Sequence, residues 1–342
     1  MTILALETSC DDTCAAVLGG DGRARSNVIS SQHVHDRFGG VVPEIASRHH
    51  LELVDAVVDR ALLDAGAELG DVDVVAATQG PGLVGALLVG LSSAKALAAA
   101  RRLPFAPVDH LQGHVAANFL SDQSGAFEPP FVCLIASGGH TLLVLVTEHD
   151  GFEVLGRTLD DAAGEAFDKG ARMLGLGYPG GAALERLAAD GDDTAFSFPG
   201  SPGKVRRGAP RKAFAEGLDF SFAGLKTALL YAIRELGPEQ AADRAADLAA
   251  SYQAAIVSSL IVRAERALER TGLDRLAVGG GVAANGELRR RLSALEATVH
   301  VPERSLCTDN AAMIASAARY APQLDYPLYL SLDAYATGET VR

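Results

Sequence analysis

The chain has 342 residues, of which 48% are hydrophobic and 21% are charged, and its formal net charge is −13. This composition excludes a mainly disordered chain, and the length predicts about two domains. Four cysteines without a Cys-x-x-Cys pair exclude a disulfide scaffold and a cysteine-based zinc site. Because the protein is acidic overall, contact with nucleic acid would require a local basic patch or a partner.

The sequence also predicts a soluble, cytoplasmic protein without membrane contact. No stretch approaches the roughly 18 uninterrupted apolar residues that a membrane span requires. The start of the chain, Met1–Glu7, has no basic residues before its short apolar run, and this excludes a secretory signal.

Short apolar runs alternate with longer segments of helical periodicity, which predicts an α/β fold. We expect strands in the hairpin 3–18 and at 73–77, 131–136, 142–147, 275–279 and 298–301. Helices are expected at 44–65, 83–100, 164–175, 241–270 and 308–320. The stretch 199–217 is rich in Gly and Pro and is typical of an exposed loop.

An internal repeat links the two halves of the chain. Ser9 and Thr13 lie between two apolar strands, and Ser137 and Thr141 lie between two others, 128 residues further on. Paired turns of this kind suit a duplicated nucleotide-binding fold, in which both turns approach phosphate groups. Two ordinary β-hairpins would give the same pattern.

Two histidines four residues apart, His110 and His114, would face the same side of a helix. This spacing can chelate a metal, although surface or helix-capping histidines have it more often. Leu111 replaces the glutamate base of a His-Glu-x-x-His metalloprotease and disfavours that class. Asp309 is a candidate third ligand, with a helix N-cap as the alternative. Two His and one carboxylate would suit Fe²⁺ or Zn²⁺.

Acidic and glycine-rich segments later in the chain are candidates for binding a nucleotide. Asp161, Glu165 and Asp168 would form one stripe on a helix, either to bind ribose hydroxyls or as a solvated acidic face. A turn follows at 178–181. The run Gly279–Asn285 lies between a strand and a helix, where glycines let the backbone approach a ligand closely. It lacks the Gly-x-Gly-x-x-Gly pattern of a dinucleotide fold.

With these residues in hand, the chain resembles, nearly end to end, the universal tRNA adenosine threonylcarbamoyltransferase family, which includes bacterial TsaD. The matching segments are 7–13, 40–44, 79–83, 110–114, 137–141, 160–169, 220–226, 279–285 and 309–310. The resemblance implies the duplicated fold of actin, Hsp70 and sugar kinases, with two lobes around a nucleotide cleft. We expect one lobe to contain 1–107 and 321–342, and the other, with the metal and nucleotide site, to contain 108–320.

The resemblance also implies an activity and a set of site residues. The family transfers the threonylcarbamoyl group of threonylcarbamoyl-AMP to N6 of the adenosine immediately 3′ of the anticodon, position 37, in tRNAs that read ANN codons. It implies His110, His114 and Asp309 as ligands of one divalent metal ion, with Fe²⁺ favoured over Zn²⁺. The residues implied for substrate binding are Ile135, Ala136, Ser137, Gly138, Gly139, Asp168, Gly181, Glu185 and Asn285.

This sequence departs from the family pattern in several places. Glu185 stands where relatives usually have Asp, and Ala182 replaces a proline. The segment 198–202 differs from the usual Pro-Arg-Pro. A basic segment follows, and we expect it either to hold the tRNA backbone or to be a solvated loop; its residues are Lys204, Arg206, Arg207, Arg211 and Lys212. No residue is assigned as the proton acceptor, and Asp11 is a candidate.

The family works with a paralogous TsaB-like subunit and a small TsaE-like ATPase. An apolar face of 44–65 or of 83–100 is a candidate contact, although burial in the protein's own core is the favoured explanation for both faces. Two other functions are alternatives. A small-metabolite kinase of the same superfamily would hold Mg²⁺ through carboxylates and would not need paired histidines. A non-catalytic scaffold switched by a nucleotide would tolerate loss of His110.

Overall fold

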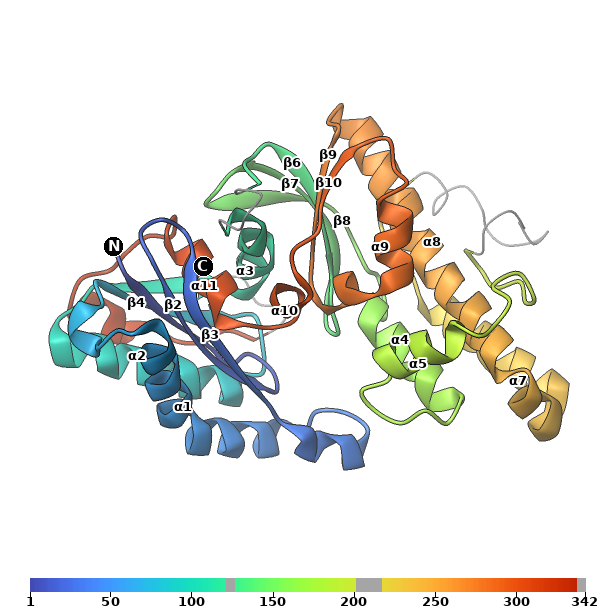
Figure 1. Cartoon of the computed structure of the whole chain (residues 1–342), viewed down its shortest axis with the longest axis horizontal. Helices are drawn as coiled ribbons and strands as arrows, with labels where there is room; N and C mark the ends of the chain where they lie inside the picture. Colours follow the sequence, from blue (N-terminus) through green and yellow to red (C-terminus); the bar gives the residue numbers. More distant parts are fainter. Residues whose placement is uncertain (121–126, 201–216, 337–342) are drawn as a thin grey trace. The chain divides into compact units, whose positions relative to one another are not determined.

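A computed structural model of the chain describes residues 1–120, 127–200 and 217–336. It contains two compact units, each built on its own sheet (Figure 1). Unit 1 consists of Met1–Pro129, Glu148–Gly151 and Thr308–Arg342, and unit 2 of Pro130–Thr147 and Phe152–Cys307. The predicted division differs from this in 108–129, 148–151 and 308–320, which group with unit 1. Helices α3 (His110–Ala116) and α11 (Ala311–Ala318) pack against each other and against the strands of unit 1, which explains why 108–129 and 308–320 group there.

Unit 1 is a five-stranded sheet in the order β3-β2-β1-β4-β5 with helices on both faces. Strand β1 pairs antiparallel with β2 and parallel with β4, and β4 pairs parallel with β5. Its strands are β1 Ile3–Glu7, β2 Asp12–Leu18, β3 Ala24–Ser31, β4 Val74–Gly80 and β5 Phe105–Asp109. Its helices are α1 Pro43–Ala65, α2 Val84–Arg101, α3 His110–Ala116 and α11 Ala311–Ala318, and short 3-10 turns lie at His33–Phe38, Leu69–Asp71, Ala117–Phe119 and Leu328–Ser331.

Side chains alternate in direction along each strand, and this shows which face of the unit 1 sheet each helix covers. Leu4 and Leu6 of β1 belong to the same buried cluster as Val54 of α1 and Leu91 of α2. Side chains of successive strand residues point to opposite faces. Helix α11 contacts β1 and β2 without belonging to this cluster, and we place it on the other face, together with α3. The sheet is therefore buried on both sides, as its continuous apolar strands require.

Unit 2 repeats this plan with the sheet order β10-β9-β6-β7-β8. Its strands are β6 Phe131–Ala136, β7 Thr141–Glu148, β8 Gly151–Arg157, β9 Arg275–Gly279 and β10 Thr298–His300. Its helices are α4 Ala163–Met173, α5 Gly181–Ala188, α7 Ala223–Asp243, α8 Ala245–Thr271, α9 Gly286–Leu292 and α10 Arg304–Cys307, with a 3-10 turn at Gly281–Ala284. Helix α8 is the core helix, because residues 248–261 are all buried.

The strand register confirms the predicted duplication. In the first hairpin Ile3 pairs with Leu18, and in the second Phe131 pairs with Val146, which are the same positions shifted by 128 residues. Reading the second sheet from β8 to β10 gives the same order of equivalent strands as reading the first from β3 to β5. The α/β class and the duplicated architecture are both as predicted.

Most expected elements are present, with differences at their ends. Helix α1 begins at Pro43, one residue earlier than predicted, because proline is well accommodated at the first helical position. The helix expected at 241–270 begins at Ala245, because a separate helix, α7, continues to Asp243. The prediction gave no residue ranges for strands β3, β5 and β8 or for helices α5, α7 and α9. The pattern of α7 is interrupted near its end by Gly237 and Pro238.

Two helices, α2 and α8, are long and apolar enough to cross a membrane by length and composition alone. This test is also passed by core helices of globular proteins, and most of the apolar window of α8 is buried inside unit 2.

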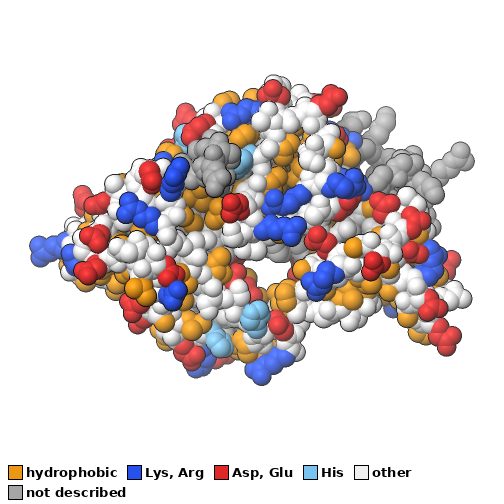
Figure 2. All heavy atoms as spheres, in the orientation of Figure 1, with side chains coloured by type: hydrophobic (Ala, Val, Ile, Leu, Met, Phe, Trp, Pro, Cys, Tyr) orange, Lys and Arg blue, Asp and Glu red, His pale blue; other side chains and the backbone are white. Residues whose placement is uncertain are grey.

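On the face shown in Figure 2, acidic and basic side chains are mixed with apolar ones among the described residues, and Lys and Arg gather there in small groups.

Candidate metal centre and nucleotide-binding loops

The carboxyl ends of the parallel strands of unit 1 bring together the residues of the candidate metal centre. Glu7 is the last residue of β1, Thr78 lies near the end of β4, and His110 follows directly after β5. Ends of neighbouring parallel strands share one edge of a sheet, which is where α/β folds place their ligands. The sequence therefore positions these side chains through the strand order.

Helix α3 carries both histidines and is anchored at its first turn. Asp109 is its N-cap, and the Oδ1 atom of this residue accepts hydrogen bonds from the backbone N–H groups of Leu111 and Gln112. Its Oδ2 atom accepts a hydrogen bond of 2.6 Å from the Tyr335 hydroxyl. Burial, together with the charge of Asp109, raises the pKa of Tyr335 and keeps this donor protonated. A segment near the end of the chain thus fixes the start of the helix that bears the histidines.

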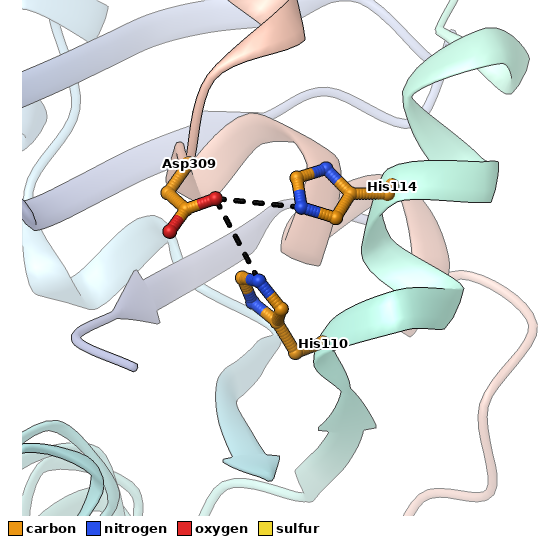
Figure 3. A group of neighbouring side chains, drawn as sticks. All are labelled: His110, His114 and Asp309. Carbon is orange, nitrogen blue, oxygen red and sulfur yellow. Dashed lines mark ion pairs between the residues drawn. The ribbon is translucent and has the colours of Figure 1, made fainter. Parts of the chain in front are cut away.

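His110, His114 and Asp309 point toward one another (Figure 3). Oδ1 of Asp309 lies 3.6 Å from Nε2 of His110 and 3.4 Å from Nε2 of His114. The rings of the two histidines lie edge to face, with centroids 4.7 Å apart. Asn310 is the N-cap of α11 and accepts from the N–H of Met313, so the alternative role considered for Asp309, the N-cap, belongs to its neighbour.

These distances are those of ligands around an ion. Two ligand atoms each ~2.1 Å from a metal lie ~3.0 Å apart at a right angle and ~3.4 Å apart at a tetrahedral angle. The observed separations of 3.4 and 3.6 Å are longer than good hydrogen bonds. His114 is fully buried, and neither of its ring nitrogens has a hydrogen-bond partner among the described residues. The three residues therefore fit a divalent metal ion, and they are the one such group found in the part of the chain that the structure describes.

Several carboxylates surround the candidate metal centre and shift the pKa values of its neighbours. Burial lowers the pKa of His110, but Asp309 and Glu7 outweigh it and raise this pKa to about 9. Burial likewise opposes ionisation of Glu7, and attraction to His110 outweighs it and holds the pKa of Glu7 below its usual value. Burial, with further repulsion from Asp309 and Asp11, raises the pKa of Asp12 to about 7. The acidic surroundings favour a cation.

A buried hydrogen-bond chain supports the hairpin turn next to this centre. The carbonyl of Cys10 can only accept, so Nε2 of His50 carries the proton and donates to it over 3.0 Å. Nδ1 of His50 then accepts from the Thr13 hydroxyl over 2.8 Å. Burial lowers the pKa of His50, which keeps the imidazole neutral in this arrangement. The role of His50 was not predicted, because its partners Cys10 and Thr13 lie far from it in the sequence.

The predicted substrate residues lie in unit 2, around the carboxyl ends of β6 and β9. Ile135 and Ala136 end β6, and Ser137 begins the turn that leads to β7. The N–H of Gly164 donates to the Ser137 carbonyl over 3.0 Å, which brings the start of α4 against this turn. A Cβ atom on Gly164 would meet that carbonyl, whereas Gly138 and Gly139 have open space beside them. The turn therefore presents accessible backbone.

A second group of these residues is linked by hydrogen bonds. Oδ1 of Asp168 accepts from the N–H groups of Gly180 and Gly181, at 2.8 and 3.2 Å. One helical turn later, Glu185 accepts from the Asn285 amide over 3.2 Å and from the N–H of Gly286 over 2.9 Å. The structure thus brings Asp168, Gly181, Glu185 and Asn285 into one neighbourhood, and the longer Glu185 side chain reaches Asn285 although relatives usually have Asp there.

The acidic stripe expected on α4 is divided between two roles. Lys169 pairs with Asp161 over 2.7 Å and with Glu165 over 2.8 Å. Asp168 instead accepts hydrogen bonds from the backbone at the start of α5.

The basic residues expected to contact tRNA lie outside the described residues; they are Lys204, Arg206, Arg207, Arg211 and Lys212. Asp11 is half-buried, and its carbonyl accepts from the N–H of Gln32.

Comparison with known proteins identifies the family. A sequence model described as TsaD, tRNA N6-adenosine threonylcarbamoyltransferase, matches residues 23–316. The chain belongs to this family. A protein of this name from Pelobacter propionicus is 48% identical over 100% of the chain and 98% of its own length. One from Symbiobacterium thermophilum is 52% identical over 93% of the chain and 91% of its own length.

The fold of this TsaD-family chain also resembles more distant solved structures. The Acidaminococcus fermentans (R)-2-hydroxyglutaryl-CoA dehydratase component A matches with a TM-score of 0.54 and 14% identity, over 94% of the chain and 97% of that protein. At this identity the similarity concerns the fold alone, and it agrees with the predicted duplicated fold of actin, Hsp70 and sugar kinases.

The raised pKa of His110 predicts that metal binding depends on pH. A metal displaces the proton from its ligand nitrogen, so the apparent affinity should rise about tenfold per pH unit toward the His110 pKa of about 9 and then level off. In the ion-free protein, protonated His110 interacts with Asp309 and Glu7 and stabilises the fold. This stabilisation is fully present below pH 6.5, the usual pKa of histidine, and is lost as the pH rises through about 9. Titration with Zn²⁺ buffered by a chelator measures the affinity, and a value that is constant from about pH 7 to 9 would contradict this electrostatic picture.

Proposed function

We propose that this protein transfers the threonylcarbamoyl group of threonylcarbamoyl-AMP to N6 of adenosine 37 in tRNAs that read ANN codons. Membership of the TsaD family carries this proposal, and the grouping of His110, His114 and Asp309 supports it. The kinase and scaffold alternatives are not favoured, because the close relatives share the transferase name over nearly their whole length.

The chemistry of the substrate explains what such a site has to supply. Threonylcarbamoyl-AMP is a mixed anhydride, so its carbonyl carbon is already activated. N6 of adenine attacks this carbon, the bond to the AMP oxygen breaks, and the amine loses a proton. A weak amine then needs orientation and a polarised carbonyl more than it needs a covalent enzyme nucleophile.

We propose that one divalent ion per subunit is held by His110, His114 and Asp309, with Fe²⁺ favoured and Zn²⁺ as the alternative. Two imidazoles and one carboxylate with open positions are the ligand set of non-haem iron sites, and zinc accepts the same donors. When bound, the ion supplies Lewis acidity and an anchor for substrate oxygens.

The residues of unit 2 are proposed to bind the adenylate. The turn from Ser137 to Thr141 offers backbone N–H groups to the phosphate, and its glycines have open space beside them. Asp168 is proposed to hold the ribose, with its orientation set by the N–H groups of Gly180 and Gly181. Residues proposed to complete the site are Ile135, Ala136, Gly138, Gly139, Gly181, Glu185 and Asn285, with the glycines at 279–281 near the base.

Two further roles that we propose are that of the proton acceptor and that of the tRNA contact. Asp11, in the turn between β1 and β2, is proposed as a candidate proton acceptor. The basic residues between Lys204 and Lys212 are proposed to hold the tRNA backbone, since they concentrate positive charge in an acidic protein.

We also propose that the protein acts in the cytoplasm with a TsaB-like paralogue and a TsaE-like ATPase. Apolar side chains on the outer surfaces of α1 and α2 support a protein contact in unit 1. Leu51 and Leu63 of α1 are each 71% exposed, and Val84 and Leu88 of α2 are also exposed. The opposite faces of both helices are buried in the core of unit 1. Helices α1 and α2 pack against each other, so these exposed side chains lie on neighbouring elements of unit 1.

Replacing a ligand tests the proposed activity. His114→Ala should abolish stoichiometric metal binding and lower transfer by at least about a hundredfold, because a two-ligand site holds a metal weakly. Purified protein, with the partner proteins, is incubated with tRNA and threonylcarbamoyl-AMP, and the modified nucleoside is measured by mass spectrometry. His33→Ala is the control, since this imidazole is 85% exposed. Full activity of His114→Ala without bound metal would refute the proposal.

A single charge on α1 tests the partner contact. Leu51→Glu should weaken binding of the purified TsaB-like subunit by at least about tenfold, because it places a charge in an apolar interface. Leu159→Glu in unit 2, where the leucine is 57% exposed, is the matched control. Binding is measured by calorimetry. Equal affinities of the two variants would place the partner elsewhere.

A further inference from the structure

Glu7 is a buried carboxylate beside the candidate metal centre that none of the proposed ligand roles uses. It is 1% exposed and is the last residue of β1. Its side chain accepts hydrogen bonds from three donors on three strand ends. Nδ1 of His110 donates over 3.0 Å and the Thr78 hydroxyl over 2.5 Å, both to Oε2, and the N–H of Ser9 donates to Oε1.

These bonds determine which nitrogen of His110 faces Asp309. A carboxylate only accepts, so Nδ1 of His110 carries a proton and donates it to Glu7. Nε2 is then the nitrogen directed at Asp309, 3.6 Å away. The Ser9 hydroxyl also lies near Nδ1, at 3.2 Å, and as a neutral oxygen it is a weaker acceptor than the carboxylate.

The two histidines differ in this respect. His110 is supported by Glu7 through its far nitrogen, whereas neither nitrogen of the fully buried His114 has a hydrogen-bond partner among the described residues. A histidine that binds a metal through one nitrogen usually donates its other N–H to a carboxylate or carbonyl, which orients the ring and makes it more basic. Only His110 meets this description within the described part of the chain.

We propose that Glu7 is a positioning residue of the metal centre, which directs Nε2 of His110 at the ion and supplies the second negative charge that balances it. This inference depends on the proposed metal site. Asp309 and Glu7 together carry two negative charges, which equal the charge of one divalent ion when both histidines are neutral. A buried ion is far less costly when its charge is balanced nearby. Thr78 and Ser9 hold Glu7 in place through the opposite sides of its carboxylate.

Removing the charge while retaining the shape tests this role. Glu7→Gln should weaken Zn²⁺ binding about 10- to 100-fold, measured by competition with a chromophoric chelator. Glu44→Gln is the matched control, because Glu44 pairs with Arg48 on the exposed surface of α1. The Zn²⁺ affinity of this control variant should equal that of the wild type. Wild-type affinity in Glu7→Gln would overturn the inference. If the wild-type protein itself binds no metal, the proposed metal site is wrong.

A measurement on the unaltered protein covers the case in which Glu7→Gln does not fold. Nitrogen-15 NMR of the Zn²⁺-loaded wild type distinguishes the two ring nitrogens of each histidine. We expect His110 to bind the metal through Nε2 and to show a hydrogen-bonded proton on Nδ1, which exchanges slowly with water. Binding through Nδ1, or the absence of that proton, would overturn the role of Glu7 even if the affinity of the site is high.

Discussion

Two imidazoles and two carboxylates lie together beside the carboxyl ends of the unit 1 strands, and their charges have to be balanced there. Asp309 and Glu7 draw a proton onto His110 and raise its pKa to about 9, which shows how strongly the surroundings favour a cation. One proton still leaves a negative excess. The separations between the ligand atoms, 3.4 and 3.6 Å, are too long for the residues to satisfy one another directly. The cap on α3, the Tyr335 contact and the hairpin turn all hold these groups where a divalent ion would relieve the imbalance.

Duplication explains how one fold carries two kinds of site. The hairpins of the two units have the same register, yet equivalent positions differ in chemistry. Glu7 corresponds to Ile135, and Asp11 corresponds to Gly139. The first copy has therefore concentrated acids at its sheet edge, while the second has small residues that leave backbone accessible. The same strand ends thus carry the candidate metal centre in unit 1 and the proposed nucleotide site in unit 2.

Sequence patterns predicted the fold well wherever they depended on local periodicity. Apolar strands and amphipathic helices such as α1 and α4 are visible in the chain, and the repeat of Ser9 and Thr13 predicted the duplication. Helix α7 was missed because Gly237 and Pro238 interrupt its pattern. The assignment of 108–129 and 308–320 to a unit differed because it depends on which sheet α3 and α11 pack against, and periodicity does not contain that information.

The candidate site was predictable where residues lie close in sequence or match the family. The spacing of His110 and His114 indicated a shared helix face, and Asp309 was a candidate third ligand that the resemblance then supported. Glu7, His50 and Tyr335 were not assigned, because their roles arise from contacts between segments far apart in the chain. A carboxylate at the end of an apolar strand carries no signal of its own until the neighbouring strands are known.

X-ray absorption spectroscopy of the metal-loaded protein tests the central claim most directly, since it reports the atoms bound to the ion. The account predicts two imidazole nitrogens and carboxylate oxygen at about 2.0 to 2.2 Å, and loss of one imidazole contribution in His114→Ala. Sulfur in the coordination sphere, or a spectrum that His114→Ala does not change, would contradict it.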